Sequence, residues 1–281
     1  MPTRNEEHNI DKCLASVAWS DDVYVVDSDS KDRTVEIAAR RHKVHITQFR
    51  GDGAGPRKLN WALEHLPWKH DWVFTIGADE EMPVALATEI LHTCRRTDKA
   101  GFLIRYWYYF LGRRLQHGAP LWKLTLMRHA QTRFERINIP EVTGYDIELH
   151  EHPIVSGPIG RLNETMVHRD SEGLHHFIER HNIYSDWEAL LRTKYKTAGA
   201  DERRVVPRLF GNATERRRWL KLAFLASPGR PFIYFLHSYL WRLGFLDGRA
   251  GFYYASLMAA YWFQIRAKEY ELRSIGSAHS P

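Results

Sequence analysis

The first hundred residues alternate between segments with a helical spacing of apolar residues and short runs with the composition of buried strands. Residues 10–17 carry apolar side chains at i, i+3, i+4 and i+7, which is the spacing of one helical face. Residues 23–26 and 72–76 are instead short and mainly apolar, as buried strands are. Similar helical patterns occupy 35–39, 59–66 and 87–94, and further strand-like runs occupy 44–47 and 102–104. This alternation predicts an α/β fold with a parallel sheet covered by helices on both faces.

The pattern changes beyond the first hundred residues. Residues 106–168 are dense in His, Gly and Pro and indicate short strands and loops, and a helix is expected from 174 to about 195. A polar connector follows, and 216–272 is aromatic, apolar and basic together. We therefore expect three parts: an α/β domain over 1–170, a helix and connector over 171–215, and an aromatic, basic helical region over 216–281.

Composition narrows the setting and the partners. The net charge of +6 favours an anionic partner. Cys13 and Cys94, both on apolar helical faces, are expected to be buried and reduced, as in the cytoplasm. The chain opens on polar residues rather than a signal peptide, and no run reaches the roughly 20 apolar residues of a transmembrane helix.

The aromatic, basic region 216–281 has the composition of helices that lie in a membrane interface. Trp and Tyr favour the headgroup level, and Lys and Arg favour anionic lipid. The alternative is an ordinary helical subdomain or a dimer interface. Nucleic acid is disfavoured as a partner, because the basic residues alternate with long apolar runs and match no recognised motif.

Two acidic clusters follow two of the expected strands. Asp27 and Asp29 come after the run 23–26, and Asp79 and Glu80 come after the run 72–76. Ligands of parallel α/β sheets bind at the carboxyl ends of strands, so both clusters are expected to face one crevice. A divalent cation or a hydrogen-bonded nucleoside would relieve their repulsion, and carboxylates suit Mg²⁺ or Mn²⁺. The alternative is that these acids cap helices, as we expect of Asp32.

Basic residues suited to a diphosphate lie between the two acidic clusters. Arg57 and Lys58 follow a glycine-rich stretch at 51–55. That stretch is not a dinucleotide fingerprint, because Pro56 stands where the third glycine belongs, and the chain contains no P-loop.

Four segments, taken in order and spacing, resemble family 2 inverting glycosyltransferases. They are Asn5–Ile10, Cys13–Val17, Val25–Thr34 and Asn60–Leu63. The likeness is nearest to the bacterial branch that contains lipopolysaccharide-core β-1,4-glucosyltransferases, and it returns at Arg242–Gly251. The resemblance implies a GT-A fold, which is a Rossmann-like mixed sheet flanked by helices. It also implies a nucleoside-diphosphate sugar donor, a divalent metal and direct displacement at the anomeric carbon.

The resemblance assigns roles to individual residues of the first domain. Asp79 would bind the metal, and His168 would add a second metal ligand. Apart from the resemblance, Trp122 and Lys123 are candidate contacts to the acceptor sugar, because aromatic rings stack on sugars. Together with the basic pair, the expected donor-binding residues are Thr3, Glu6, Asp27, Asp29, Arg57, Lys58, Ala78 and Asp79. The alternatives are a solvated or core histidine at 168 and a buried tryptophan at 122.

An inverting transferase also needs a general base for the acceptor hydroxyl. The stretch His150-Glu151-His152-Pro153 resembles the His-Glu pair of this branch and nominates Glu151, with Asp146 and Glu148 as second choices. A zinc site is disfavoured there, because the stretch lacks the spacing that places two histidines on one helical face.

Two departures from the family pattern stand out. Gly77 occupies a position where the family usually has Asp, so we expect weakened or altered donor contacts rather than loss of function. The family's first strand normally precedes Pro2, whereas only Met1 does here, so we expect the natural start to lie upstream.

The leading hypothesis is therefore transfer of a hexose, glucose from UDP-glucose, to a lipid-linked saccharide at the inner face of the bacterial cytoplasmic membrane, with Mg²⁺ or Mn²⁺ as cofactor. The first alternative is a sugar nucleotidyltransferase, although residues 3–6 do not form its glycine-rich phosphate loop. The second is a catalytically degenerate scaffold that binds nucleotide sugar and membrane.

Overall fold

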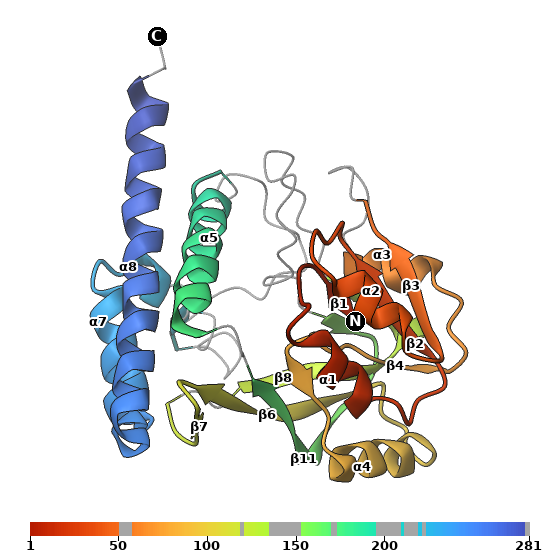
Figure 1. Ribbon diagram of the computed structural model, residues 1–281. Helices are drawn as coiled ribbons and strands as arrows, with labels where there is room; N and C mark the ends of the chain where they lie inside the picture. Colours follow the sequence, from red (N-terminus) through yellow and green to blue (C-terminus); the bar gives the residue numbers. More distant parts are fainter. Residues whose placement is uncertain are drawn as a thin grey trace. The chain divides into compact units, whose positions relative to one another are not determined.

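The computed structural model describes residues 1–50, 58–118, 121–134, 153–169, 173–194, 209–210, 219–220 and 223–278 (Figure 1). The chain divides into two compact units. The first unit comprises Met1–Arg114 and Pro120–Gly173, and the second comprises Leu115–Ala119 and Leu174–Pro281. Each unit is considered by itself below.

A small parallel sheet opens the first unit. It contains β1 (Pro2–Thr3), β2 (Val23–Asp27) and β3 (Val44–Gln48), in that spatial order. The connecting helices are α1 (Ile10–Ser16) and α2 (Thr34–Ala39). Ile10 and Leu14 pack with Val25 and Ala38 in one apolar cluster, which explains the helical spacing in the sequence. The predicted parallel arrangement is confirmed for these three strands.

The larger sheet is mixed, as the family resemblance implied, whereas the local apolar pattern by itself indicated a parallel sheet. Its order is β4-β8-β6-β11-β5, with β7 also paired to β6. The bounds are β4 (Trp72–Phe74), β5 (Glu80–Glu81), β6 (Gly101–Phe110), β7 (Arg113–Leu115), β8 (Leu121–Arg128) and β11 (Ile159–Arg169). Strand β8 runs antiparallel to both β4 and β6, while β11 runs parallel to β6. Apolar runs reveal burial but not strand direction, so the pattern 72–76 and 102–104 could not exclude this arrangement.

Residues 106–168 also form longer strands than expected. Strands β6 and β11 have 10 and 11 residues, respectively, and both reach well into a region predicted to hold only short strands and loops. Their polar and aromatic residues obscured the pattern, because each strand has exposed positions along its length. Beside them lie the 3₁₀ turn η1 (His129–Gln131) and a hairpin of β9 (Thr132–Phe134) and β10 (Pro153–Val155).

The core of the first unit lies between the mixed sheet and helices α1 and α4 (Val84–Cys94). Leu86 and Ile90 of α4 pack with Ile104 and Met166 of the sheet. A further helix, α3 (Lys58–His65), contributes the buried Asn60, which holds the backbone of Phe134 through two hydrogen bonds. A largely apolar cavity of about 450 Å³ is bordered by residues of both sheets.

The two cysteines are free thiols. Cys13 is fully buried in the core, as predicted, whereas Cys94 is only partly buried because it ends helix α4. Burial raises the pKa of the Cys94 thiol to about 11, so this thiol is protonated at neutral pH.

The described residues of the second unit are mainly helical. The elements are α5 (Gly173–Lys194), α7 (Arg230–Phe235), the π-helical turn η2 (Leu236–Trp241), the 3₁₀ turn η3 (Gly244–Asp247) and α8 (Gly248–Ala278). The helix predicted from 174 to about 195 is confirmed. Lys268 of α8 bonds to Asn182 and to Asp186 of α5, so the two helices lie side by side (Figure 1).

A buried ion pair joins α7 to α8. The Arg230 side chain is almost fully buried, and its Nη2 lies 3.1 Å from Oε2 of Glu269. Breaking such a pair by removing one partner leaves an uncompensated buried charge. None of the helices in the described part of the chain has the length and hydropathy needed to cross a membrane.

Candidate active site

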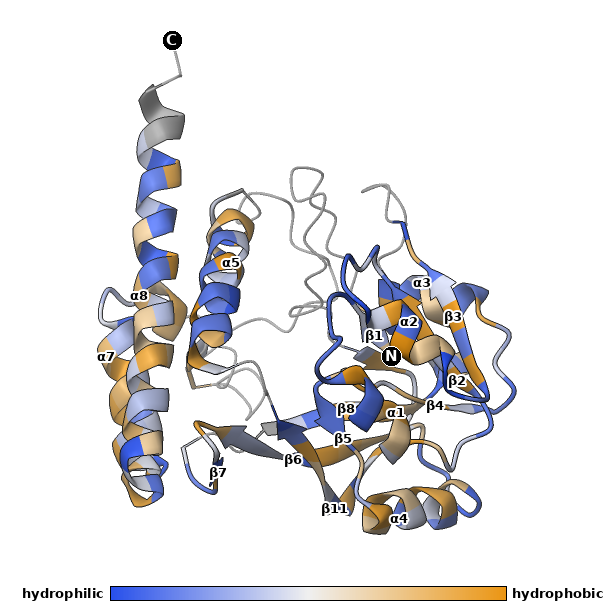
Figure 2. Cartoon of the chain, in the orientation of Figure 1, coloured by the Kyte–Doolittle hydropathy of each residue, from blue (hydrophilic) through white to orange (hydrophobic). Residues whose placement is uncertain are grey.

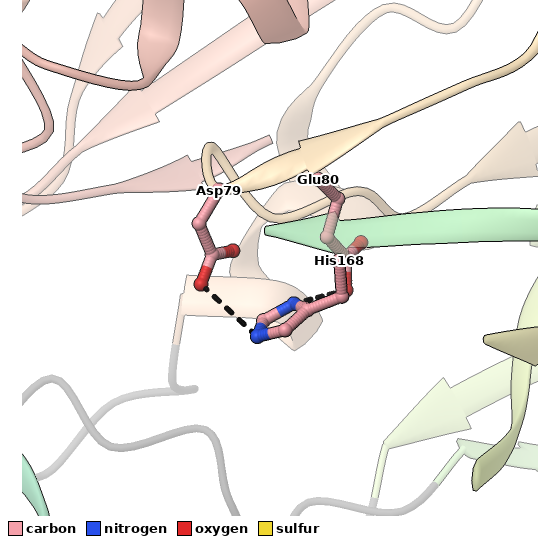
Figure 3. Close-up of side chains that lie close together, drawn as sticks. All are labelled: Asp79, Glu80 and His168. Carbon is pink, nitrogen blue, oxygen red and sulfur yellow. Dashed lines mark ion pairs between the residues drawn. The ribbon is translucent and has the colours of Figure 1, made fainter. Parts of the chain in front are cut away.

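The predicted metal ligands Asp79 and His168 come together in the first unit, at the edge of the mixed sheet. The short strand β5 pairs antiparallel with β11, and the register places His168 directly opposite Glu80. A turn precedes β5, in which the Gly77 N–H donates to Glu80 Oε2 at 2.9 Å and the Glu80 N–H donates to the Gly77 carbonyl. Strand pairing therefore gathers Asp79, Glu80 and His168 from segments almost ninety residues apart (Figure 3).

The three side chains converge on one point. His168 Nε2 lies 3.6 Å from Asp79 Oδ2, and His168 Nδ1 lies 3.7 Å from Glu80 Oε1. One ligand atom from each residue lies within 4.8 Å of the others. The His168 ring also stacks on Tyr108 of β6, with centroids 4.8 Å apart, which fixes its plane. We call this group the Asp79–Glu80–His168 cluster.

Glu80 is a buried carboxylate with a cationic partner. Lys123 Nζ of β8 lies 2.8 Å from Glu80 Oε1 and also sits over the Tyr106 ring. Burial by itself raises the pKa of Glu80, but the Lys123 ammonium and the His168 imidazole outweigh burial and lower the pKa to about 2. Glu80 is therefore anionic at neutral pH.

The donor set of the cluster fits a divalent cation. Both Glu80 oxygens are already engaged, one by Lys123 and one by the Gly77 N–H, so Asp79 and His168 are the side chains that would hold the ion. His168 Nδ1 is buried and makes no hydrogen bond to any described residue. A proton on Nδ1 would face Glu80, which leaves the Nε2 lone pair available on the side of Asp79. A carboxylate with an imidazole suits Mn²⁺, and Mg²⁺ with added water.

Glu80→Gln tests whether Glu80 orients His168 for a cation. We expect metal affinity to fall roughly 10–100-fold, because the amide neither fixes the Nδ1 proton nor balances Lys123 as a carboxylate does. The measurement is titration of Mn²⁺ by calorimetry. Glu81→Gln is the matched control, since Glu81 is the neighbouring acid on the same short strand and lies outside the cluster. Equal Mn²⁺ affinity in the two variants would contradict this role.

Three of the predicted donor-binding residues meet at the carboxyl end of β2. Thr3 pairs with Asp27 in the sheet register, and Lys58 Nζ donates to the Thr3 carbonyl at 3.3 Å. All three side chains are buried, and Asp27 is fully so. Asp27 accepts hydrogen bonds from the backbone and the hydroxyl of Ser30, which orders the loop after the strand.

The remaining acids of this loop have local partners. Asp29 is exposed in a left-handed backbone conformation (φ 58°) and pairs with Lys31, which lowers the pKa of Asp29. Glu6 accepts a hydrogen bond from the Asn9 side chain. Asp32 accepts from the backbone N–H of Thr34, the first residue of α2, but the N-cap residue of that helix is Arg33 and not Asp32 as expected.

The other predicted site residues are placed less favourably or lie elsewhere. Ala78 is buried in the apolar cluster of α1 and β2, so only its backbone can face a ligand. Trp122 is 41% exposed, with the Arg161 guanidinium 5.2 Å from its ring centroid, and is not the buried tryptophan of the alternative. Arg57, Glu151, Asp146 and Glu148 lie outside the described residues.

Sequence reasoning placed Glu80 in the acidic cluster without giving it a role of its own, and it missed Tyr108 altogether. Glu80 had a signal, since it directly follows Asp79, and the nearby chain offers Lys123 as a partner of opposite charge. Tyr108 had none, because its position under His168 depends on the register of two strands about sixty residues apart.

The first 149 residues, just over half of the chain, match the family model described as Glycosyl transferase family 2. The chain belongs to this family. A C-terminal helical unit accompanies its GT-A-like mixed sheet, and both predictions are confirmed. It is therefore a glycosyltransferase.

Similar proteins extend the comparison. The chain is 26% identical over 279 residues to the lipopolysaccharide core biosynthesis glycosyltransferase LpsC of Rhizobium meliloti, covering 94% of this chain and 90% of LpsC. It is 26% identical over 197 residues to an uncharacterized glycosyltransferase of Rickettsia bellii, covering 66% of this chain and 64% of that protein. The crystal structure of S. aureus TarS 1-349 aligns with a TM-score of 0.44 and 16% identity, covering 97% of this chain and 90% of that one.

Proposed function

We propose that this family 2 glycosyltransferase moves a hexose, glucose from UDP-glucose, to a lipid-linked saccharide of the bacterial cell envelope with inversion at the anomeric carbon. We further propose that it belongs to the lipopolysaccharide-core β-1,4-glucosyltransferase branch and acts at the inner face of the cytoplasmic membrane. Support for this acceptor class comes from the similarity to LpsC, which spans nearly the full length of both chains.

The observation that carries the proposal is the pairing of Asp79 with His168. Two side chains from distant segments converge at 3.6 Å beside a strand end, which is where a sheet of this type binds ligands. Ordinary packing does not require a carboxylate and an imidazole to meet while a second acid, Glu80, is separately neutralised by Lys123. A nucleoside diphosphate bound through a cation explains the arrangement.

The residues divide the chemistry between them. Thr3, Asp27 and Lys58 would form the buried end of the nucleotide pocket, and Asp79 with His168 would hold Mg²⁺ or Mn²⁺. Such an ion would supply positive charge that offsets the charge of the departing diphosphate. Glu151 takes the proton of the acceptor hydroxyl as its oxygen bonds to the anomeric carbon. The bond from that carbon to the diphosphate oxygen breaks, and its electron pair leaves with the nucleotide.

The chain is also divided into three functional regions. We propose residues 1–170 as the GT-A catalytic domain, 171–215 as a helix and connector, and 216–281 as a membrane-associating helical region. Trp122, which is exposed, and Lys123 stand as the proposed contacts to acceptor sugar.

A thermal-shift screen of nucleoside-diphosphate sugars, each with and without Mn²⁺, tests the proposed donor. Binding stabilises the folded state by RT ln(1 + [L]/Kd), about 2.7 kcal/mol at a hundredfold excess over Kd. We expect UDP-glucose to give the largest rise in Tm, and only with the metal. A metal-independent rise, or a larger rise with another sugar nucleotide, would contradict this donor assignment. Release of pyrophosphate from a nucleoside triphosphate and a sugar phosphate would favour a nucleotidyltransferase instead.

A further inference from the structure

Large apolar side chains are exposed together in the second unit where α7 continues into η2 and η3. Trp241 is 83% exposed and Phe232 is 76% exposed. Four leucines of the same segment, Leu236, Leu240, Leu243 and Leu246, are about half exposed. Phe232, Leu236 and Leu240 recur every fourth residue, which places them on one side of the continuous α7–η2 helix. We call the set the apolar tip: Phe232, Leu236, Leu240, Trp241, Leu243 and Leu246. Figure 2 shows hydrophobic residues along α7 and the adjoining part of α8.

The apolar tip rests on a packed aromatic layer. The Tyr239 ring contacts those of Phe235, Phe245 and Phe252, with centroids 5.2–6.2 Å apart. Phe252 belongs to α8, so the layer fixes the tip to the longest helix of the unit. The exposure of the tip is therefore a property of a well-packed element, and it leaves apolar surface that a soluble protein ordinarily buries.

Backbone geometry locks the turn that carries Trp241 and Leu243. Leu243 has a left-handed conformation (φ 59°), which is unfavourable for a leucine. Gly244 and Gly251 approach so closely that a Cβ on Gly251 would lie 2.0 Å from the Gly244 carbonyl oxygen. Asp247 accepts hydrogen bonds from the backbone N–H groups of Gln116 and His117. These contacts account for the glycines and the aspartate within Arg242–Gly251. They also fix the backbone that carries the exposed Trp241 and Leu243.

Charge identifies the partner. Residues 216–281 contain ten Lys and Arg and three acids, giving +7 where the whole chain carries +6. Asp247 is buried and engaged, and Arg230 is buried in its pair with Glu269, so these groups contribute little to the charge at the surface. Arg242 lies within the tip segment, and Arg249 is exposed just beyond it. Anionic lipid headgroups attract basic residues that lie near the membrane surface.

A bilayer fits these features better than another macromolecule does. A second copy of the chain would bring two strongly basic surfaces together, which opposes self-association. An indole ring flanked by leucines and arginines suits the interfacial region of a membrane. There the ring lies among the headgroups, and the arginines contact lipid phosphates.

We propose that the apolar tip inserts into the headgroup region of an anionic bilayer, with Trp241 as its main anchor and the surrounding arginines on lipid phosphates. This inference rests on the proposed membrane location of the enzyme and names the surface that would achieve it.

Vesicle co-sedimentation of the purified full chain tests the proposal. The vesicles contain phosphatidylcholine alone or with about one third phosphatidylglycerol, without acceptor. We expect the wild type to bind the anionic vesicles, and the double variant Trp241→Ser, Leu246→Ser to show a partition coefficient at least tenfold lower. Trp19→Ser is the matched control, since Trp19 is an exposed tryptophan of the first unit and should leave binding unchanged.

Three outcomes would overturn the proposal. The first is that the wild-type chain does not bind anionic vesicles, and the second is that the double variant binds them as well as the wild type does. The third is that the wild type forms a dimer and the double variant does not. The last would assign the tip to a second copy. The donor-induced rise in Tm is measured on the same preparations, so that its absence counts against the proposed function and not against the tip.

Discussion

Asp79→Ala is expected to lower kcat/KM for sugar transfer by about 1000-fold or more, because it removes the carboxylate proposed to hold the cation against the diphosphate. His168 cannot compensate, since its Nδ1 side faces Glu80 and only Nε2 faces the position of the Asp79 carboxylate. The expected accompanying result is that Mn²⁺ no longer enhances the rise in Tm produced by the donor. Both quantities are measured on purified protein with UDP-glucose and an isolated acceptor.

Asp98→Ala provides the control for Asp79→Ala. Asp98 is an exposed acid of the first unit that pairs with its neighbour Lys99. Its removal alters the net charge equally, yet we expect normal turnover. Asp79 lies in the turn before β5 with its side chain 14% exposed, so the unfolding midpoint of the variant without ligand is measured alongside, to separate a folding defect from loss of the metal site. Normal transfer by the Asp79 variant would remove the metal from the proposed mechanism.

Glu151→Gln is expected to lower kcat by about 10²–10⁴-fold while donor binding remains intact, because the amide cannot accept the proton of the acceptor hydroxyl. The amide preserves the size of the side chain, so a loss confined to kcat isolates the missing base. The measurement is transfer at saturating donor and acceptor, together with the donor-induced rise in Tm. An unchanged Tm response with a lost kcat would separate Glu151 from the donor site.

Asp146→Asn and Glu148→Gln are the matched variants for the base. Both residues belong to the same acidic stretch as Glu151, and we expect kcat to fall by less than about tenfold for either. A large loss in one of them, with normal turnover in Glu151→Gln, would transfer the role of base to that residue.

Local pattern predicted much of the first unit, for a clear physical reason. Helices α1 and α4 and strands β2 and β4 bury their apolar faces in the core, so their spacing is visible in the sequence. The same holds for α5, whose start and end agree with the prediction to within one residue. Strand direction was not visible, because burial looks the same whether a neighbour is parallel or antiparallel. The mixed sheet, with β8 antiparallel between β4 and β6, was predicted only from the family resemblance.

Part of the candidate site was visible in the sequence, and part was visible only in the structure. Asp79 stood out in the sequence because it follows a buried strand, and strand ends are where α/β sheets bind ligands. Its partners are set by contacts that no local pattern encodes. The pairing of β5 with β11 brings His168 to Asp79, and the pairing of β11 with β6 places Tyr108 under the imidazole ring. Lys123 reaches Glu80 only because β8 and β5 belong to one curved sheet.

The sequence by itself determined the helix and strand segments with strong apolar spacing, the family, the basic and aromatic character of residues 216–281, and Asp79 as the residue to examine. Each of these depends on residue type and on separations of a few positions. Only the tertiary structure decided the mixed strand order, the Asp79–Glu80–His168 cluster, and which apolar residues of the second unit are exposed. Those features depend on backbone hydrogen bonds and packing between segments up to about 130 residues apart, such as Asp247 with Gln116.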